Sequence, residues 1–224
     1  MRFQEATFLL LTSGIAVSAA LAVWGQYSPS RRSLVFAFKP LTTALICGLA
    51  VLPAPAFGGR YGWAVLAGLL FSLAGDVFLM LPKDRFREGL AAFLVAHLCY
   101  LFAFTSDTSF LAAYGPFVCW MVLGAALLRF LWPGIPPGLR APVVVYVLIL
   151  LCMAAQANTR AIRLPCPSSL LASAGATLFV VSDGLLALDR FRTRFRSARA
   201  LVQITYFVAQ WLIAASVTLY QGAA

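Results

Sequence analysis

Eight stretches of mostly apolar residues follow one another along this chain, and this succession limits its fold more than any other feature. A helix that crosses a membrane needs about 20 apolar residues. Short polar or proline-containing breaks separate the stretches, and the 62% hydrophobic share of the 224 residues is far above that of soluble domains. The sequence therefore predicts an all-α integral membrane protein, with eight transmembrane helices in a single domain over residues 1–224.

The breaks between the stretches set the predicted limits of the spans. An even number of spans places both termini on the same side of the membrane. The first stretch has only Arg2 and Glu5 as charged residues before it and no small-residue cleavage site after it, so we interpret it as a span and not as a signal peptide. The predicted spans are Ala6 to Trp24, Leu34 to Leu52, Gly62 to Leu81, Gly89 to Phe104, Phe110 to Leu131, Ala141 to Ala157, Ser168 to Leu188 and Ala200 to Tyr220.

The net charge of +10 is distributed unevenly over the loops, which favours a membrane topology and not nucleic-acid binding. Loops rich in Lys and Arg face the cytoplasm, so this distribution predicts that both termini are non-cytoplasmic. The cluster from Arg190 to Arg199 is interpreted as a topology determinant that also attracts anionic lipid, with a dedicated headgroup site as the alternative. One set of loops holds Arg31, Arg32, Lys83, Arg85, Arg87, Arg129, Arg140, Arg190, Arg192, Arg194, Arg196 and Arg199, and the opposite set holds Arg2, Arg60, Arg160 and Arg163.

Familiar catalytic and metal-binding motifs are missing from the sequence. The five cysteines form no CxxC pair, and most lie within predicted spans, where they are interpreted as small buried hydrophobic residues. No P-loop, GxSxG or HExxH motif occurs. We therefore expect no metal ion and no cofactor, and any chemistry must come from the few polar residues inside the spans.

Two aspartates lie inside the most apolar stretches, Asp76 in FSLAGDVFLML and Asp183 in LFVVSDGLLAL. An ionisable group in a membrane helix costs roughly 2.5 to 3.5 kcal/mol on insertion scales, so such a residue indicates a functional site by default. This insertion cost occurs at both aspartates in similar surroundings, which favours a functional role over a chance occurrence.

The two aspartate segments are similar to each other, and the similarity predicts an internal repeat. GDVFLMLPKDRF aligns with SDGLLALDRF, and FLVAHL in the next predicted helix aligns with YFVAQW. The repeat would comprise residues 1–105 and 110–224 as two parallel four-helix halves. Each aspartate lies five residues before the predicted helix end, at Leu81 and Leu188, or about 7.5 Å deep. We expect both carboxylates to face a shared axis at one level.

The same count places other polar side chains in this layer, where small residues would let the helices approach closely. Lys39 is interpreted either as a binding residue or as the partner of an aspartate in a structural ion pair. His97 is interpreted either as an active-site residue or as the donor of a hydrogen bond to a backbone carbonyl. The polar residues of the layer are Lys39, His97, Tyr206 and Gln210, and the small residues are Gly68, Ser72, Gly75, Ala172 and Ala176.

At these residues the sequence resembles the YhhN-like family of lysoplasmalogenases. The resemblance implies an eight-helix fold without a cofactor, with a lysophospholipid and water as substrates and the bilayer as surroundings. The products would be a fatty aldehyde and glycerophosphoethanolamine or glycerophosphocholine, and the two aspartates would be the catalytic pair. The resemblance rests on Lys39-Pro40, Ser72 to Asp76, Gly89-Leu90, Phe93, His97, Tyr100, Gly175 to Phe179, Ser182-Asp183, Tyr206 and Ala209-Gln210.

Vinyl ether hydrolysis fits a pair of carboxyl groups. It needs a proton delivered to the alkene carbon and water to attack the resulting oxocarbenium ion. Burial and a like-charged neighbour should keep one carboxyl protonated while the other stays ionised, although the sequence does not assign the two roles. Lys39 would then bind the substrate phosphate, and the remaining candidates would bind substrate hydroxyls or water: His97, Tyr100, Tyr206 and Gln210.

Three other classes of protein remain as alternatives. A proton-coupled transporter of small molecules or lipids would use the same aspartates, although carrier sites usually lie nearer the midplane. An intramembrane aspartyl protease would require a fuller motif around Gly75-Asp76, and a structural scaffold would leave both carboxylates unexplained. A bacterial inner membrane and a eukaryotic internal membrane are both compatible with the sequence, which predicts no oligomeric state.

Overall fold

The described residues fold into a bundle of eight long α-helices. The computed structural model describes residues 2–52, 59–82 and 84–220, so Lys83 lies outside the described residues. Two short 3-10 turns, η1 (Pro29–Arg31) and η2 (Trp132–Gly134), precede α2 and α6. The helices are α1 (Arg2–Gly25), α2 (Arg32–Ala50), α3 (Arg60–Met80), α4 (Phe86–Phe104), α5 (Tyr114–Leu131), α6 (Pro137–Arg163), α7 (Pro167–Phe191) and α8 (Ala198–Thr218).

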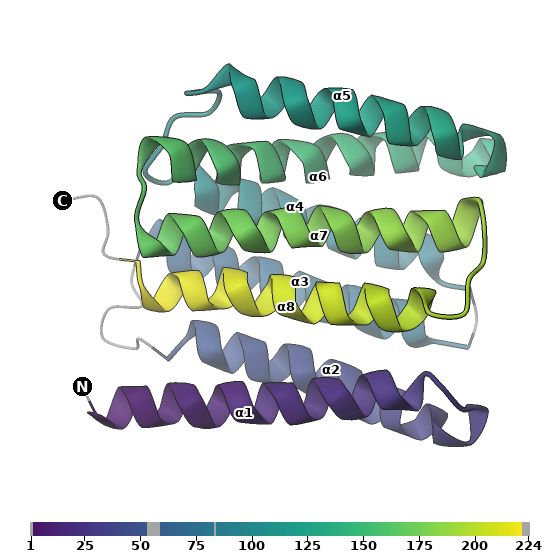
Figure 1. The fold of residues 1–224 in the computed structure, drawn as a ribbon, viewed down its shortest axis with the longest axis horizontal. Coiled ribbons are helices and arrows are strands. Elements are labelled where there is room, and N and C mark those ends of the chain that lie inside the picture. The colour runs from purple at the N-terminus through teal and green to yellow at the C-terminus, as the bar shows by residue number, and fades with distance from the viewer. Residues whose placement is uncertain (1, 53–58, 83, 221–224) are drawn as a thin grey trace.

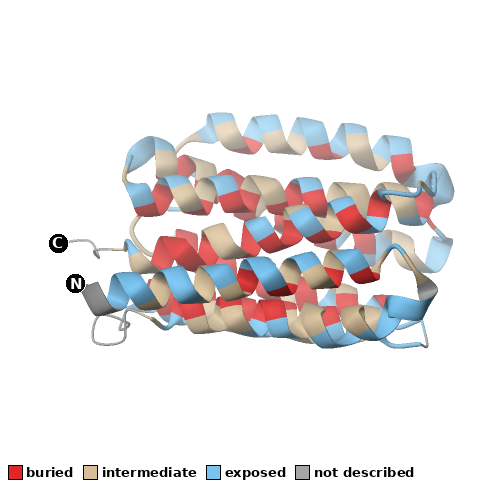
Figure 2. Cartoon of the chain, turned by 60° about the horizontal axis from the view of Figure 1, so that its bottom comes forward, coloured by how far each residue is buried: buried red, intermediate tan, exposed pale blue. Residues whose placement is uncertain are grey.

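The helices run up and down side by side, and α1 begins at the end of the bundle where α8 finishes (Figure 1). All eight are long and apolar enough to cross a membrane, so the prediction of an all-α, multi-pass membrane protein is confirmed. Helices α3 and α4 pack along each other, as do α7 and α8, while α4 also packs on α6 and α8 on α2. Buried residues face the interior of the bundle (Figure 2). Helices α1 and α5 have the smallest share of buried residues.

The helix limits differ from the prediction mainly in the second half of the chain. Helix α6 extends beyond the predicted Ala141 to Ala157, and α7 continues past Leu188 to Phe191. Asp183 therefore lies eight residues before the end of α7, or about 12 Å, whereas Asp76 lies four residues before Met80, or about 6 Å. The two distances differ because the polar residues after Leu188 remain helical, with a basic Arg190 in the last turn of α7. Equal depth of the two carboxylates in the membrane stays a prediction.

Arg160 was predicted in a loop, but it is a buried residue of α6 with 1% of its surface exposed. Its Nε and Nη2 atoms donate hydrogen bonds to the two carboxylate oxygens of Asp107, at 2.8 and 2.9 Å. The guanidinium group also lies over the rings of Tyr61 and Tyr220, 4.7 and 5.5 Å from their centroids. The helix can bury this charge because the two-point ion pair compensates it.

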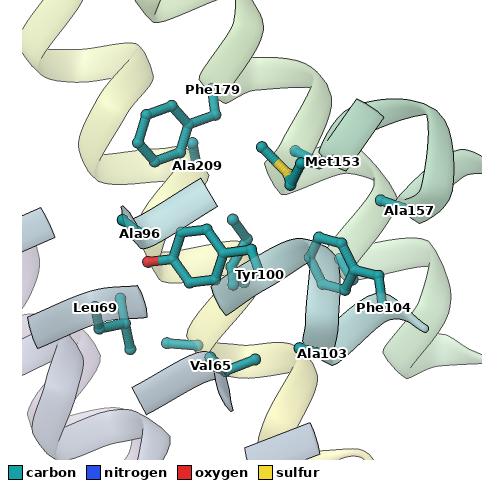
Figure 3. Packing of buried hydrophobic residues seen from close by; sticks show 14 of the residues in the cluster. Val65, Leu69, Ala96, Tyr100, Ala103, Phe104, Met153, Ala157, Phe179 and Ala209 are labelled. Atoms are coloured by element: carbon teal, nitrogen blue, oxygen red, sulfur yellow. The ribbon is translucent and has the colours of Figure 1, made fainter. Parts of the chain in front are cut away.

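Small residues on α3 bring α4 close, as predicted. A Cβ atom at Gly68 would lie 2.3 Å from the ring of Tyr100, and one at Gly75 would lie 2.6 Å from the ring of Phe93. These contacts bury Tyr100 completely, within the core that Figure 3 shows around its ring. The approach of α4 places its polar residues inside the bundle beside those of α3.

Candidate active site

The carboxylate of Asp76 is held by residues from α2 and α8 as well as by its position on α3. Lys39 Nζ lies 3.0 Å from Oδ1. The hydroxyl groups of Thr43 and Tyr206 each donate to Oδ2 at 2.7 Å. Asp76 is 1% exposed, so its three donors replace the water that an ionised carboxylate would otherwise bind. Lys39 thus forms the ion pair that was one of its two interpretations.

A second set of buried polar groups lies beside this carboxylate. The hydroxyl of Tyr100 donates to Gln210 Oε1 at 2.7 Å, and Ser72 Oγ lies 3.4 Å from the same hydroxyl. Gln210 is fully buried, and its Nε2 atom has no partner within the described part of the chain. An amide nitrogen with two hydrogens and no acceptor is a ready donor for a water or a substrate oxygen.

Asp183 has a separate set of partners, from α6 and α4. The hydroxyl of Tyr146 donates to Asp183 Oδ2. His97 Nε2 lies 3.5 Å from the same oxygen and 3.0 Å from the Tyr146 hydroxyl. The Asp183 side chain is 14% exposed, and His97 Nδ1 is buried without a partner among the described residues. Asp183 is therefore the more accessible of the two carboxylates and the less heavily hydrogen-bonded.

Aromatic rings lie between the two carboxylate clusters. The ring of Phe179 is 4.7 Å from that of His97 and 5.6 Å from that of Tyr206, both nearly perpendicular to it. Phe93 packs edge-on against Phe179 and Tyr206. No hydrogen bond between described residues joins the clusters, so each carboxylate has donors of its own and the two do not share a proton directly.

Comparison with known proteins identifies the family to which the chain belongs. Residues 34–217 match the model of the YhhN family. The chain belongs to the YhhN family. It is 33% identical over 214 residues to a protein of Escherichia coli O157:H7 named uncharacterized membrane protein YhhN, an alignment that covers 94% of this chain and all of the relative.

Mammalian relatives carry a name that includes an activity. The lysoplasmalogenase TMEM86B of Rattus norvegicus is 33% identical over 204 residues, which are 90% of this chain and 80% of the relative. The lysoplasmalogenase TMEM86B of Homo sapiens is 31% identical over 191 residues, which are 80% of this chain and 73% of the relative. No solved structure is significantly similar to the chain.

In this member of the YhhN family, each carboxylate site combines helices in the same way. Asp76 on α3 meets residues of α2 and α8, and Asp183 on α7 meets residues of α6 and α4. Each site thus draws on the second and third helices of one predicted half and the fourth helix of the other half. The internal repeat itself stays a prediction, and this exchange of fourth helices is the arrangement that it would produce.

All seven site residues predicted from the sequence lie in these polar clusters, but two hydrogen-bonding residues were missed. Thr43 follows Lys39 by four residues, so the two share a helix face, a spacing that could have identified it. Tyr146 lies in the middle of an apolar stretch and has no counterpart at the aligned position of α2, so no motif marked it. Among the described residues, no group of three or more His, Cys, Asp or Glu side chains is placed to hold a metal ion.

Proposed function

We propose that this protein is a lysoplasmalogenase, a membrane hydrolase that cleaves the vinyl ether bond of lysoplasmalogens. The products would be a fatty aldehyde and glycerophosphoethanolamine or glycerophosphocholine. The observation that carries the proposal is the presence of two intramembrane carboxylates with different hydrogen-bond partners, in a chain about one-third identical to proteins named lysoplasmalogenases. An acid and a separate anion are what this reaction requires.

Asp183 is the proposed proton donor. Its Oδ2 accepts the hydroxyl hydrogen of Tyr146, and its Oδ1 has no donor among the described residues, so Oδ1 is the oxygen on which a transferable proton can reside. Its partial exposure also gives the carboxyl group access to the substrate and to replacement protons. The neighbouring His97 would hold the Tyr146 hydroxyl, which lies 3.0 Å from its Nε2 atom.

Asp76 is the proposed anion. Lys39, Thr43 and Tyr206 direct one cation and two hydroxyl donors at its oxygens, an environment that stabilises the carboxylate form. A fixed negative charge on this side of the site would stabilise an oxocarbenium ion, as a carboxylate does in glycosidases. In this arrangement Lys39 maintains the charge of Asp76 and does not serve primarily to bind the substrate phosphate.

The reaction then balances with water as the only co-substrate. Asp183 transfers its proton to the β-carbon of the vinyl ether, and the oxygen-bearing carbon becomes an oxocarbenium ion. Water attacks that carbon and loses a proton, which restores the acid form of Asp183. The resulting hemiacetal collapses to the fatty aldehyde and the free glycerol hydroxyl. The unpaired Gln210 Nε2 is suited to bind the water or a glycerol oxygen.

One end of the bundle holds Arg31, Arg85 and the cluster from Arg190 to Arg199, and it is called the arginine-rich end. The proposed orientation places this end in the cytoplasm and both termini on the other side. The substrate would enter from the cytoplasmic leaflet, with its single chain between apolar helices and its headgroup at the arginine-rich end. Labelled lysoplasmalogen confined to the opposite leaflet should be hydrolysed far more slowly. Equal rates from both leaflets would contradict this route of entry.

A proton-coupled transporter is the second candidate, because membrane carboxylates with proton-relay partners are common in carriers. The deciding assay uses protein in detergent, where no second compartment exists. We expect release of fatty aldehyde from lysoplasmenylethanolamine and none from its saturated ether analogue, with activity retained after chelation of divalent ions. Folded protein that releases no aldehyde would reject the hydrolase and favour the transporter.

A further inference from the structure

A shallow, open surface cavity of about 700 Å³ lies at the arginine-rich end of the bundle, where α5, η2 and the end of α7 meet. It shares no residue with either carboxylate cluster. Its lining combines two cationic side chains with an aromatic and apolar wall: Ala126, Arg129, Phe130, Trp132, Pro133 and Arg192. A cavity of this composition at a membrane boundary can receive a ligand that is anionic at one end and apolar at the other.

The two arginines of this cavity lack the carboxylate partners that Arg85 and Arg190 at the same end possess. Arg190 bonds to Asp84 at 2.7 Å, and Arg85 bonds to Glu88 at 3.1 Å. Arg129 and Arg192 form no ion pair with any described carboxylate, and the Arg192 guanidinium lies over the ring of Phe130, 4.9 Å from its centroid. Two guanidinium groups thus line one cavity without an anion, and a phosphate group would match their charge.

The apolar wall continues along the outer face of α5. Val118, Val122, Ala126 and Phe130 are spaced four residues apart, so they form one stripe that leads from the cavity along the helix. All four are exposed, including 60% of Val118 and 65% of Val122. Trp132, which lines the cavity, is also exposed, and tryptophan commonly anchors helices in the headgroup region. An acyl chain could follow this stripe while its headgroup occupies the cavity.

We infer that this cavity binds the headgroup phosphate of an anionic diacyl phospholipid, with Arg129 and Arg192 on the phosphate and one acyl chain along α5. Basic cavities between transmembrane helices are typical sites for such lipids. The second cavity at this end contains Asp84 and Glu88 beside its arginines, so it is less suited to a negative headgroup. The inference is independent of the proposed enzymatic reaction.

The test compares two double variants that remove the same charge. Arg129→Gln with Arg192→Gln removes both cationic side chains from the cavity. Arg194→Gln with Arg196→Gln removes two exposed arginines that follow Arg192 in the same loop but lie outside the cavity lining. Native mass spectrometry measures the binding of phosphatidylglycerol and of phosphatidylcholine to each protein in detergent. We expect phosphatidylglycerol to bind the wild type and the control, and to bind the cavity variant roughly 30-fold more weakly.

Three further measurements identify the ligand and test whether the cavity variant is folded. Arg129→Lys with Arg192→Lys keeps both charges and should retain most of the binding, which shows that the loss follows charge and not damage to the fold. Glycerol 3-phosphate should not displace the lipid, and the KM for lysoplasmenylethanolamine should be unchanged in the cavity variant.

Several results would overturn the inference. Equal losses in the two Gln double variants would show only general attraction between the loops and anionic lipid. Equal binding of phosphatidylcholine by the wild type would remove the charge argument. Displacement by glycerol 3-phosphate at the same concentration would indicate a site for a soluble phosphate, and a raised KM with unchanged phosphatidylglycerol binding would assign the cavity to the substrate.

Discussion

Substitution of Asp107 by asparagine should strongly destabilise the bundle, because Asp107 compensates the buried charge of Arg160. Arg160 is 1% exposed, and both oxygens of Asp107 accept its hydrogen bonds. Removal of one partner from a buried ion pair typically costs about 3 to 5 kcal/mol, because the other charge is left without compensation. Solvent screening is weak because the two side chains are only 1% and 8% exposed, so most of this cost should appear.

The assay is thermal unfolding in detergent, with an exposed pair as the control. A loss of 3 to 5 kcal/mol corresponds to a fall in Tm of roughly 10 °C for a chain of this length. Glu88→Gln breaks the pair with Arg85, in which both side chains are 43% exposed, so it should cost less than about 1 kcal/mol.

A second substitution separates charge from packing. Arg160→Met added to Asp107→Asn removes the uncompensated guanidinium and retains an apolar side chain between Tyr61 and Tyr220, so it should recover more than half of the lost stability. If Asp107→Asn costs no more than Glu88→Gln, the pair is solvated and the reasoning is wrong.

Three further predictions concern the site and the arginine-rich end. Tyr146→Phe should lower kcat for aldehyde release roughly tenfold or more with little change in KM, because it removes the donor to Asp183. Gly134→Ala should destabilise by about 1 to 3 kcal/mol in thermal unfolding, since its Cβ would lie 1.6 Å from the Phe191 carbonyl oxygen, whereas Gly115→Ala meets no atom within 4 Å. The Arg190 hydrogen bond lowers the pKa of Asp84. The wild type should therefore have a slightly higher free energy of unfolding than Asp84→Asn at neutral pH, and this difference should disappear as the pH falls through that pKa.

The sequence predicted the helices well because membrane insertion imposes a length and a composition on each of them. Eight apolar stretches correspond to eight helices, and the polar residues that an apolar helix excludes marked the candidate site. The exact ends were less predictable. A polar residue such as Arg160 resembles a loop residue in sequence, and its ion pair with Asp107 allows the helix to include it.

The division of polar residues into two clusters could not be predicted from depth alone. Counting along each helix placed Lys39 and Tyr206 near Asp76, but it also placed His97 in the same layer without indicating which carboxylate it serves. That choice depends on which helices are neighbours, because α4 packs on α6 and α8 packs on α2. The intervening Phe179 belonged to a recognised motif, but its place between the clusters followed only from the packing.

The most direct test of the central proposal is the rate of aldehyde release by Asp76→Asn and Asp183→Asn in detergent. Asp84→Asn serves as the control because it removes an exposed carboxylate outside both clusters. We predict that each site substitution lowers the rate at least about 100-fold, the usual contribution of a general acid or a stabilising charge, while the control keeps the wild-type rate. Asp76→Asn leaves Lys39 without its anion and should lower the Tm, so the rates are compared below the Tm of each variant, where all three are folded. A folded Asp76→Asn or Asp183→Asn variant with the wild-type rate would contradict the assignment of these carboxylates to the chemistry.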